Sequence, residues 1–146
     1  ITYYKGELIM NIKKIVGYTL SKPNEFLWYY DGQKLTIERV FKNKEEISEF
    51  NNDEIDMIVQ YIKNNGEVDL SNNVSKVKDG SEKPGIGKFI YENIRMDTTF
   101  QQSSSQLVSI MYDIGVLDYN NKKRNMKFWI KDSNWKEKIN SFCKNT

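Results

Sequence analysis

The sequence predicts an α+β protein, in which an N-terminal antiparallel β-hairpin sheet plus a helix precedes a C-terminal unit of helices and a basic hairpin. Three observations support this order. Two strand-like runs flank Asp31-Gly32, an apolar stripe at helical spacing follows them, and residues 98–130 run from a helix directly into a basic hairpin. With 146 residues, 38% of them hydrophobic, the chain can bury a core in one domain or in two small ones.

The N-terminal sheet is predicted from alternating apolar residues. A strand over 12–20 is followed by a hairpin whose runs, 26–30 and 33–41, flank an Asp-Gly pair, which favours a two-residue turn. That turn pairs Trp28 with Leu35 and gathers most apolar side chains on one face, as burial in a core requires. A rival interpretation makes the aromatic residues a base-stacking platform for single-stranded nucleic acid.

A helix is expected over 54–64, because four apolar residues there fall on one stripe at helical spacing. These four residues are Ile55, Ile58, Val59 and Ile62. Acidic residues lie before this stripe and between its first members. Their spacing matches no calcium loop. A solvated helix face is therefore favoured over a metal site or a surface that mimics phosphate. The acids concerned are Glu45, Glu46, Glu49, Asp53, Glu54 and Asp56.

The expected domains are a small α+β domain over 10–70 and a second domain over 86–146, separated by a linker or insertion over 71–85. The middle segment is polar and contains Gly, Ser and Pro, which is typical of exposed loops. Residues 1–9 have two interpretations. They are translated sequence upstream of a natural start at Met10, or they form a genuine N-terminal strand.

The composition excludes several kinds of catalysis. The chain contains no histidine, which rules out serine–histidine triads and His/Cys zinc sites within it. The run GIGK at 85–88 lacks both the upstream glycine and the following Ser or Thr of a phosphate loop. The single cysteine, Cys143, cannot form an intramolecular disulfide. We therefore expect a protein that is not an enzyme and has no catalytic residues, no metal and no cofactor.

The C-terminal half is predicted as two helices and a hairpin. A short helix over 86–94 leads through a tight turn to a second helix over 98–114, capped by Thr98. Strands over 116–120 and 124–130 then pair around a basic turn. A short C-terminal helix beyond them covers the core or pairs with a second copy of the chain.

This order resembles the winged helix-turn-helix family of bacterial regulators. In that family a short helix, a turn, a Ser-rich recognition helix and a basic hairpin follow one another, and the corresponding runs here are KFIYENI, TTFQQSSSQLVSIMYDIGVL and DYNNKKRNMKFWI. The resemblance covers about residues 86–130 and extends to Glu54 if the preceding helix and strand are included. It implies a C-terminal winged helix-turn-helix whose wing lies within 118–130.

The resemblance also implies which residues contact double-stranded DNA. The exposed face of the helix over 98–114 would read base edges in the major groove, where Gln is suited to adenine. The basic wing would contact phosphate groups or the minor groove. The implied residues are Thr99, Gln101, Gln102, Ser105, Gln106, Lys122, Lys123, Arg124 and Lys127.

The leading expectation is a non-enzymatic DNA-binding protein of bacterial or phage type, located in the cytoplasm and acting in transcription regulation. Local charge agrees, since residues 86–131 carry seven basic and four acidic side chains, whereas residues 1–85 carry 12 and 14. A homodimer is compatible with this role, and no apolar run suggests a membrane partner. The alternatives are a protein-binding module or inhibitor of a nucleic-acid enzyme, and an accessory domain of a nuclease.

Overall fold

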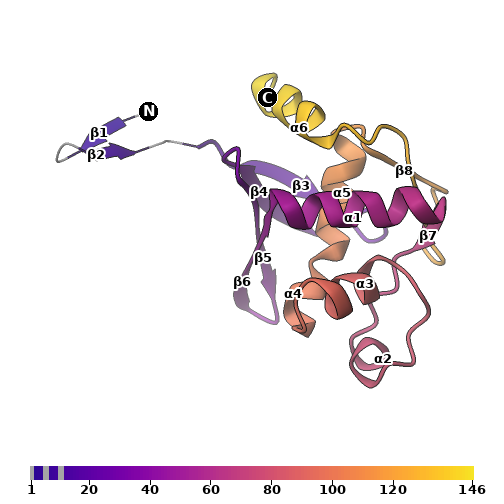
Figure 1. Ribbon diagram of the computed structural model, residues 1–146. Helices are drawn as coiled ribbons and strands as arrows, with labels where there is room; N and C mark the ends of the chain where they lie inside the picture. Colours follow the sequence, from indigo (N-terminus) through magenta and orange to yellow (C-terminus); the bar gives the residue numbers. More distant parts are fainter. Residues whose placement is uncertain (1, 5–6, 10–11) are drawn as a thin grey trace.

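The structure is a computed structural model that describes residues 2–4, 7–9 and 12–146 (Figure 1). Its first two strands, β1 (Thr2–Tyr4) and β2 (Glu7–Ile9), pair with each other in an antiparallel hairpin. They form a two-stranded sheet of their own. Met10, the alternative start of the natural chain, lies outside the described residues.

A four-stranded antiparallel sheet follows, in which each strand pairs with the next one along the chain. Its strands are β3 (Ile15–Tyr18), β4 (Glu25–Tyr30), β5 (Lys34–Phe41) and β6 (Lys44–Asn51). The side chains alternate between the two faces of the sheet, as a half-buried sheet requires. The predicted inward face is confirmed, because all its members are buried: Phe26, Trp28, Tyr30, Leu35 and Ile37.

The predicted register of the Asp-Gly hairpin is wrong by two residues. Trp28 lies opposite Ile37 rather than Leu35, so the loop between the paired strands has four residues instead of two. The carboxylate of Asp31 causes this difference, because it accepts hydrogen bonds from the backbone N–H groups two and three residues further on, at 2.8 and 2.9 Å. A shift of two residues leaves every side chain on its own face, and the burial pattern survives for that reason.

Strand β6 is a second correction, because the sequence predicts part of a solvated helix face there. The chain turns at Lys42 and Asn43, which both adopt positive φ, and then pairs along the whole length of β5. The acidic residues of this segment obscure the alternating pattern of a strand, so its buried residues, Ser48 and Phe50, are not evident from the sequence. Glu45, Glu46 and Glu49 therefore lie on a strand, while Asp53, Glu54 and Asp56 lie on the following helix.

The rest of the chain consists of helices and a three-stranded antiparallel sheet with the order β7-β9-β8. Its elements are α1 (Asn52–Asn65), β7 (Glu67–Asp69), α2 (Val74–Asp79), α3 (Ile86–Asn93), α4 (Thr98–Gln102), α5 (Ser104–Asp113), β8 (Leu117–Tyr119), β9 (Lys127–Ile130) and α6 (Trp135–Lys144). The predicted apolar stripe of α1 is confirmed, since its four members are buried. Among the described residues, no helix combines the length and apolar character that crossing a membrane needs.

The helix predicted over 98–114 is interrupted, and its predicted cap is wrong. The segment forms α4 and α5, which are separated at Ser103. The hydroxyl of Ser103 donates a hydrogen bond to the carbonyl of Phe100 and so competes with regular helical bonding. The N-cap is Asp97 rather than Thr98, because its carboxylate accepts hydrogen bonds from N–H groups of the first turn at 2.9 and 3.2 Å.

Residues 71–85 are not simply an exposed loop or linker, because they contain α2 and three buried side chains. These side chains are Ser71, Val77 and Glu82. The carboxylate of Glu82 accepts a hydrogen bond from the N–H of Asn73 at 3.0 Å and closes the segment on itself. The polar residues of this segment, which suggest a loop, thus form hydrogen bonds that stabilise a folded segment.

One cluster of buried side chains includes residues of both segments expected as domains, 10–70 and 86–146. In Figure 1, α5 and α1 lie beside the four-stranded sheet. The ring of Phe50 on β6 lies 4.5 Å from that of Phe100 on α4, between centroids. The ring of Trp28 on β4 lies 5.8 Å from that of Phe142 on α6. The two segments therefore share a continuous core.

Candidate nucleic-acid interface and an adjoining polar hollow

The basic loop, residues 120–126, joins β8 to β9. Its exposed cations are Lys122, Lys123 and Arg124. None of the three forms an ion pair with another residue that the structure describes. Asn121 and Asn125 flank them with positive φ of 59° and 55°, a conformation that Asn tolerates better than most residues. The loop thus presents three neighbouring cations to solvent.

Lys127 differs from these cations because it is paired. Its Nζ lies 2.6 Å from Oδ1 of Asp69 on β7, and Nζ of Lys83 lies 3.3 Å from the same oxygen. Burial raises the pKa of Asp69, but the two ammonium groups outweigh it and hold the pKa below its usual value. Lys127 therefore links β9 to β7 through an ion pair.

We expect Asp69 to make the stability of the protein decrease in acid. Its pKa is lower in the folded protein than the ~3.9 of an unfolded chain, so its ion pairs stabilise the fold fully above that pH. This contribution is lost as the pH falls through the folded pKa. The free energy of unfolding, measured at neutral and acidic pH, should therefore change less in Asp69→Asn than in the wild type.

The control for this prediction is Glu67→Gln. Glu67 is exposed on the same strand and has no ion pair among the described residues. The control should keep the pH dependence of the wild type. Equal changes in both variants would contradict the role of Asp69.

Two of the predicted base-reading residues are engaged within the protein. Gln101 is fully buried, and its Nε2 donates a 3.4 Å hydrogen bond to the carbonyl of Asn72. Thr99 is half-buried, and its backbone carbonyl accepts a hydrogen bond from Nη2 of Arg39 at 2.7 Å. Both contacts join the helical segment to parts of the chain that sequence analysis assigned to the other domain or to the linker.

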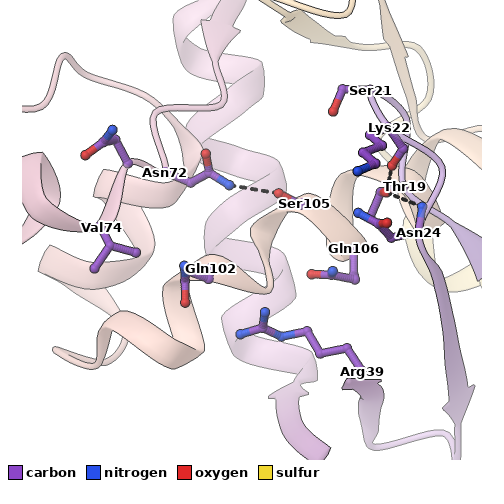
Figure 2. Close-up of a pocket in the computed structure, with 11 residues that line it drawn as sticks. Thr19, Ser21, Lys22, Asn24, Arg39, Asn72, Val74, Gln102, Ser105 and Gln106 are labelled. Carbon is purple, nitrogen blue, oxygen red and sulfur yellow. Dashed lines mark hydrogen bonds between the residues drawn. The ribbon is translucent and has the colours of Figure 1, made fainter. Parts of the chain in front are cut away.

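The other three, Gln102, Ser105 and Gln106, line a polar hollow of about 360 Å³ (Figure 2). The polar hollow lies between α4 and α5, the β3–β4 connection, β5 and the segment that follows β7. Apart from Val74, every side chain that lines it is polar or basic, and none is acidic. The structure thus brings these three predicted residues together, but it turns them toward other parts of the same chain.

Hydrogen bonds hold the walls of the polar hollow in place. Nδ2 of Asn72 donates to Oγ of Ser105 at 2.8 Å. On the opposite wall, Oγ1 of Thr19 accepts from the N–H of Asn24 at 2.9 Å and donates to the carbonyl of Lys22. Figure 2 shows these contacts as dashed lines on the two sides of the hollow. Hydrogen bonds within the protein therefore fix the positions of several of these polar groups.

Arg39 is the most buried charged residue of the polar hollow, with 7% of its surface exposed. Its Nε–H has no hydrogen-bond partner among the described residues. Burial lowers the pKa of Arg39, while Glu46 on the neighbouring strand raises it to a smaller extent. The guanidinium stays charged at neutral pH. Sequence reasoning missed Arg39, although a charge at an inward strand position, two residues after Ile37, was a usable signal.

The polar hollow adjoins the basic loop through Asn72. This residue lines the hollow and also lines a smaller depression of about 200 Å³ that includes Lys83 and Asn125. Comparison of the chain with protein-family models, curated proteins and solved structures finds no match. The chemistry of the basic loop and of the polar hollow is therefore the basis for assigning a function.

Proposed function

We propose that the chain is a non-enzymatic DNA-binding protein whose basic loop contacts the phosphate groups of a duplex. The observation that carries this proposal is the run Lys122, Lys123 and Arg124, which is exposed and has no ion pair among the described residues. Such cations release condensed counterions when they meet phosphates, and this release provides affinity that does not depend on sequence.

The order of the elements supports a winged-helix interpretation. From α1 onward, leaving aside the inserted α2, the chain runs helix, strand, three helices (α3, α4 and α5) and two strands, and β9 pairs between β7 and β8. In such a module α4 and α5 together take the place of the recognition helix, and the basic loop is the wing. Residues 71–85, with α2, are then an insertion between the first strand and the second helix.

We further propose that the basic loop contributes more to binding than the helical segment. Gln101 is buried, and Gln102, Ser105 and Gln106 line the polar hollow, so few side chains of α4 and α5 are free to read base edges. Phosphate contacts position a protein on DNA and carry no sequence information directly. The affinity for duplexes of different sequence should therefore be similar.

Replacing Lys122, Lys123 and Arg124 together by Ala should weaken DNA binding and make it less sensitive to salt. If each cation contacts one phosphate, the slope of log K against log salt concentration should become shallower by about three. Fluorescence anisotropy with a labelled duplex, repeated over a series of salt concentrations, measures both quantities. A second duplex of unrelated sequence tests the expected lack of sequence preference.

The matched control removes three other exposed lysines, Lys42, Lys44 and Lys63, and changes the net charge equally. It should keep most of the affinity and the salt slope of the wild type. Equal losses in both variants would assign binding to net charge alone. Absence of affinity even at low salt would contradict DNA binding and favour the protein-contact alternative, for which Val40 and Ile47 are exposed on the outer face of the sheet.

A further inference from the structure

We propose that the polar hollow is a binding site for a phosphate group, with Arg39 and Lys22 as its cationic contacts. This site adjoins the basic loop but includes none of its residues, and it does not depend on the DNA-binding proposal. Its volume of about 360 Å³ lies in the usual range of small-molecule pockets, about 300–1,000 Å³. Its walls are polar and basic, however, so they suit a hydrophilic anion instead of an apolar ligand.

Arg39 is buried without a compensating negative charge among the described residues, which favours an anionic ligand. Only 7% of the surface of Arg39 is exposed, yet no carboxylate among the described residues lies within ion-pair distance of its guanidinium. A buried charge normally has such a partner, because desolvation is costly without one. Nη2 donates a hydrogen bond to the carbonyl of Thr99, whereas the Nε–H has no acceptor among the described residues. A phosphate group in the hollow would supply the missing negative charge, and a small rotation of the Arg39 side chain would bring its Nε–H onto a phosphate oxygen.

The neighbouring groups also favour an anion, and they restrict the chemical class of the ligand. Lys22 is exposed beside the hollow and brings a second positive charge, while Asn24 and Gln102 provide amide groups. Figure 2 shows the Arg39 side chain extending toward the wall that carries Gln102. Oε1 of Gln106 is buried without a donor among the described residues. Gln106 lines the hollow, so a rotation of its side chain would present this oxygen to a hydroxyl or amino group near the phosphate, as in a mononucleotide or sugar phosphate.

The experiment titrates the full chain with inorganic phosphate and with deoxyadenosine monophosphate at constant ionic strength. Two-dimensional NMR of nitrogen-bound protons follows Arg39 Nε–H and the side-chain amides of Asn24, Gln102 and Gln106. These signals should shift together and yield one dissociation constant, which should be lower for the nucleotide. Lys22→Glu should raise that constant by about tenfold or more, because it replaces an attractive charge with a repulsive one.

The control is Lys63→Glu on α1, an exposed lysine that does not line the polar hollow. It should bind phosphate like the wild type. The proposal is overturned if the Arg39 signal does not respond to either ligand, or if the two charge reversals weaken binding equally. Arg39→Lys keeps the charge but loses the planar fork, so it should also bind more weakly. Because Lys22 is exposed, its variant remains informative even if the Arg39 variant fails to fold.

Two further arms identify the source of the phosphate and separate this proposal from DNA binding. A short duplex that displaces the nucleotide assigns the site to the DNA backbone, and a duplex that binds without displacing it assigns the site to a free ligand. The triple Ala variant of the basic loop should keep its affinity for the nucleotide while losing affinity for DNA. Loss of nucleotide binding in that variant would overturn the assignment to the polar hollow.

Discussion

Replacing Phe50 with Ala should lower the free energy of unfolding by about 3–5 kcal/mol. Phe50 is completely buried on β6, and its ring packs against that of Phe100 on α4 with 4.5 Å between centroids. The substitution removes an aromatic pair and leaves a cavity where the four-stranded sheet meets the helical half of the chain. Because both halves share one cluster of buried side chains, the whole chain should lose stability together.

Denaturant unfolding followed by tryptophan fluorescence and by far-ultraviolet circular dichroism measures this effect. The tryptophans lie in different parts of the fold, with Trp28 on β4, Trp129 on β9 and Trp135 on α6. The two signals should therefore change in one coincident transition, in the wild type and in the variant. Two separate transitions, of which only one shifts, would contradict a shared core and support a domain boundary within residues 71–85.

Val40→Ala is the control for the Phe50 substitution. Val40 lies on the adjacent strand β5, but 74% of its surface is exposed. Its truncation should change the free energy of unfolding by no more than about 0.5 kcal/mol. A large effect at Val40 would show that strand propensity, and not burial, determines stability in this sheet.

Burial explains which parts of the fold could be predicted from the sequence. The inward face of β4 and β5 and the apolar stripe of α1 follow from periodicity, because each places its apolar side chains on one side of a regular element. Strand register and helix boundaries depend on individual polar contacts, which the periodicity of apolar residues does not reveal. The carboxylate of Asp31 lengthens the hairpin loop, and the hydroxyl of Ser103 interrupts a helix whose apolar pattern continues through it.

The basic loop and the polar hollow also differ in how far the sequence predicts them. The basic loop was predictable because its three cations are consecutive in the sequence. The polar hollow combines residues from 19–24, β5, the segment after β7 and the α4–α5 segment, and no local motif marks any of them. The residues predicted to read DNA bases are polar and lie in a helical pattern, but the segments that enclose them are distant in the sequence. Only tertiary structure reveals that enclosure.

The glycines of the run GIGK have a structural role. As a phosphate loop the run fails, since it lacks the required flanking residues. In the structure, Gly85 and Gly87 lie where the start of α3 meets the segment after β7. A Cβ at Gly87 would lie 2.6 Å from the carbonyl oxygen of Ser71 and 2.8 Å from Cα of Asn72. The glycines thus serve close approach of two backbone segments.

Gly87→Ala should therefore destabilise the protein by about 1–3 kcal/mol, although Ala is normally favoured over Gly within a helix by up to ~1 kcal/mol. The clash is with backbone atoms, so α3 has to move away and strain the 2.7 Å hydrogen bond from the N–H of Gly87 to the carbonyl of Leu70. Thermal and denaturant unfolding measure the change. The control, Ser141→Ala on the exposed surface of α6, should be neutral or slightly stabilising. If Gly87→Ala is as stable as the wild type, α3 is free to shift, and the close approach does not fix its position.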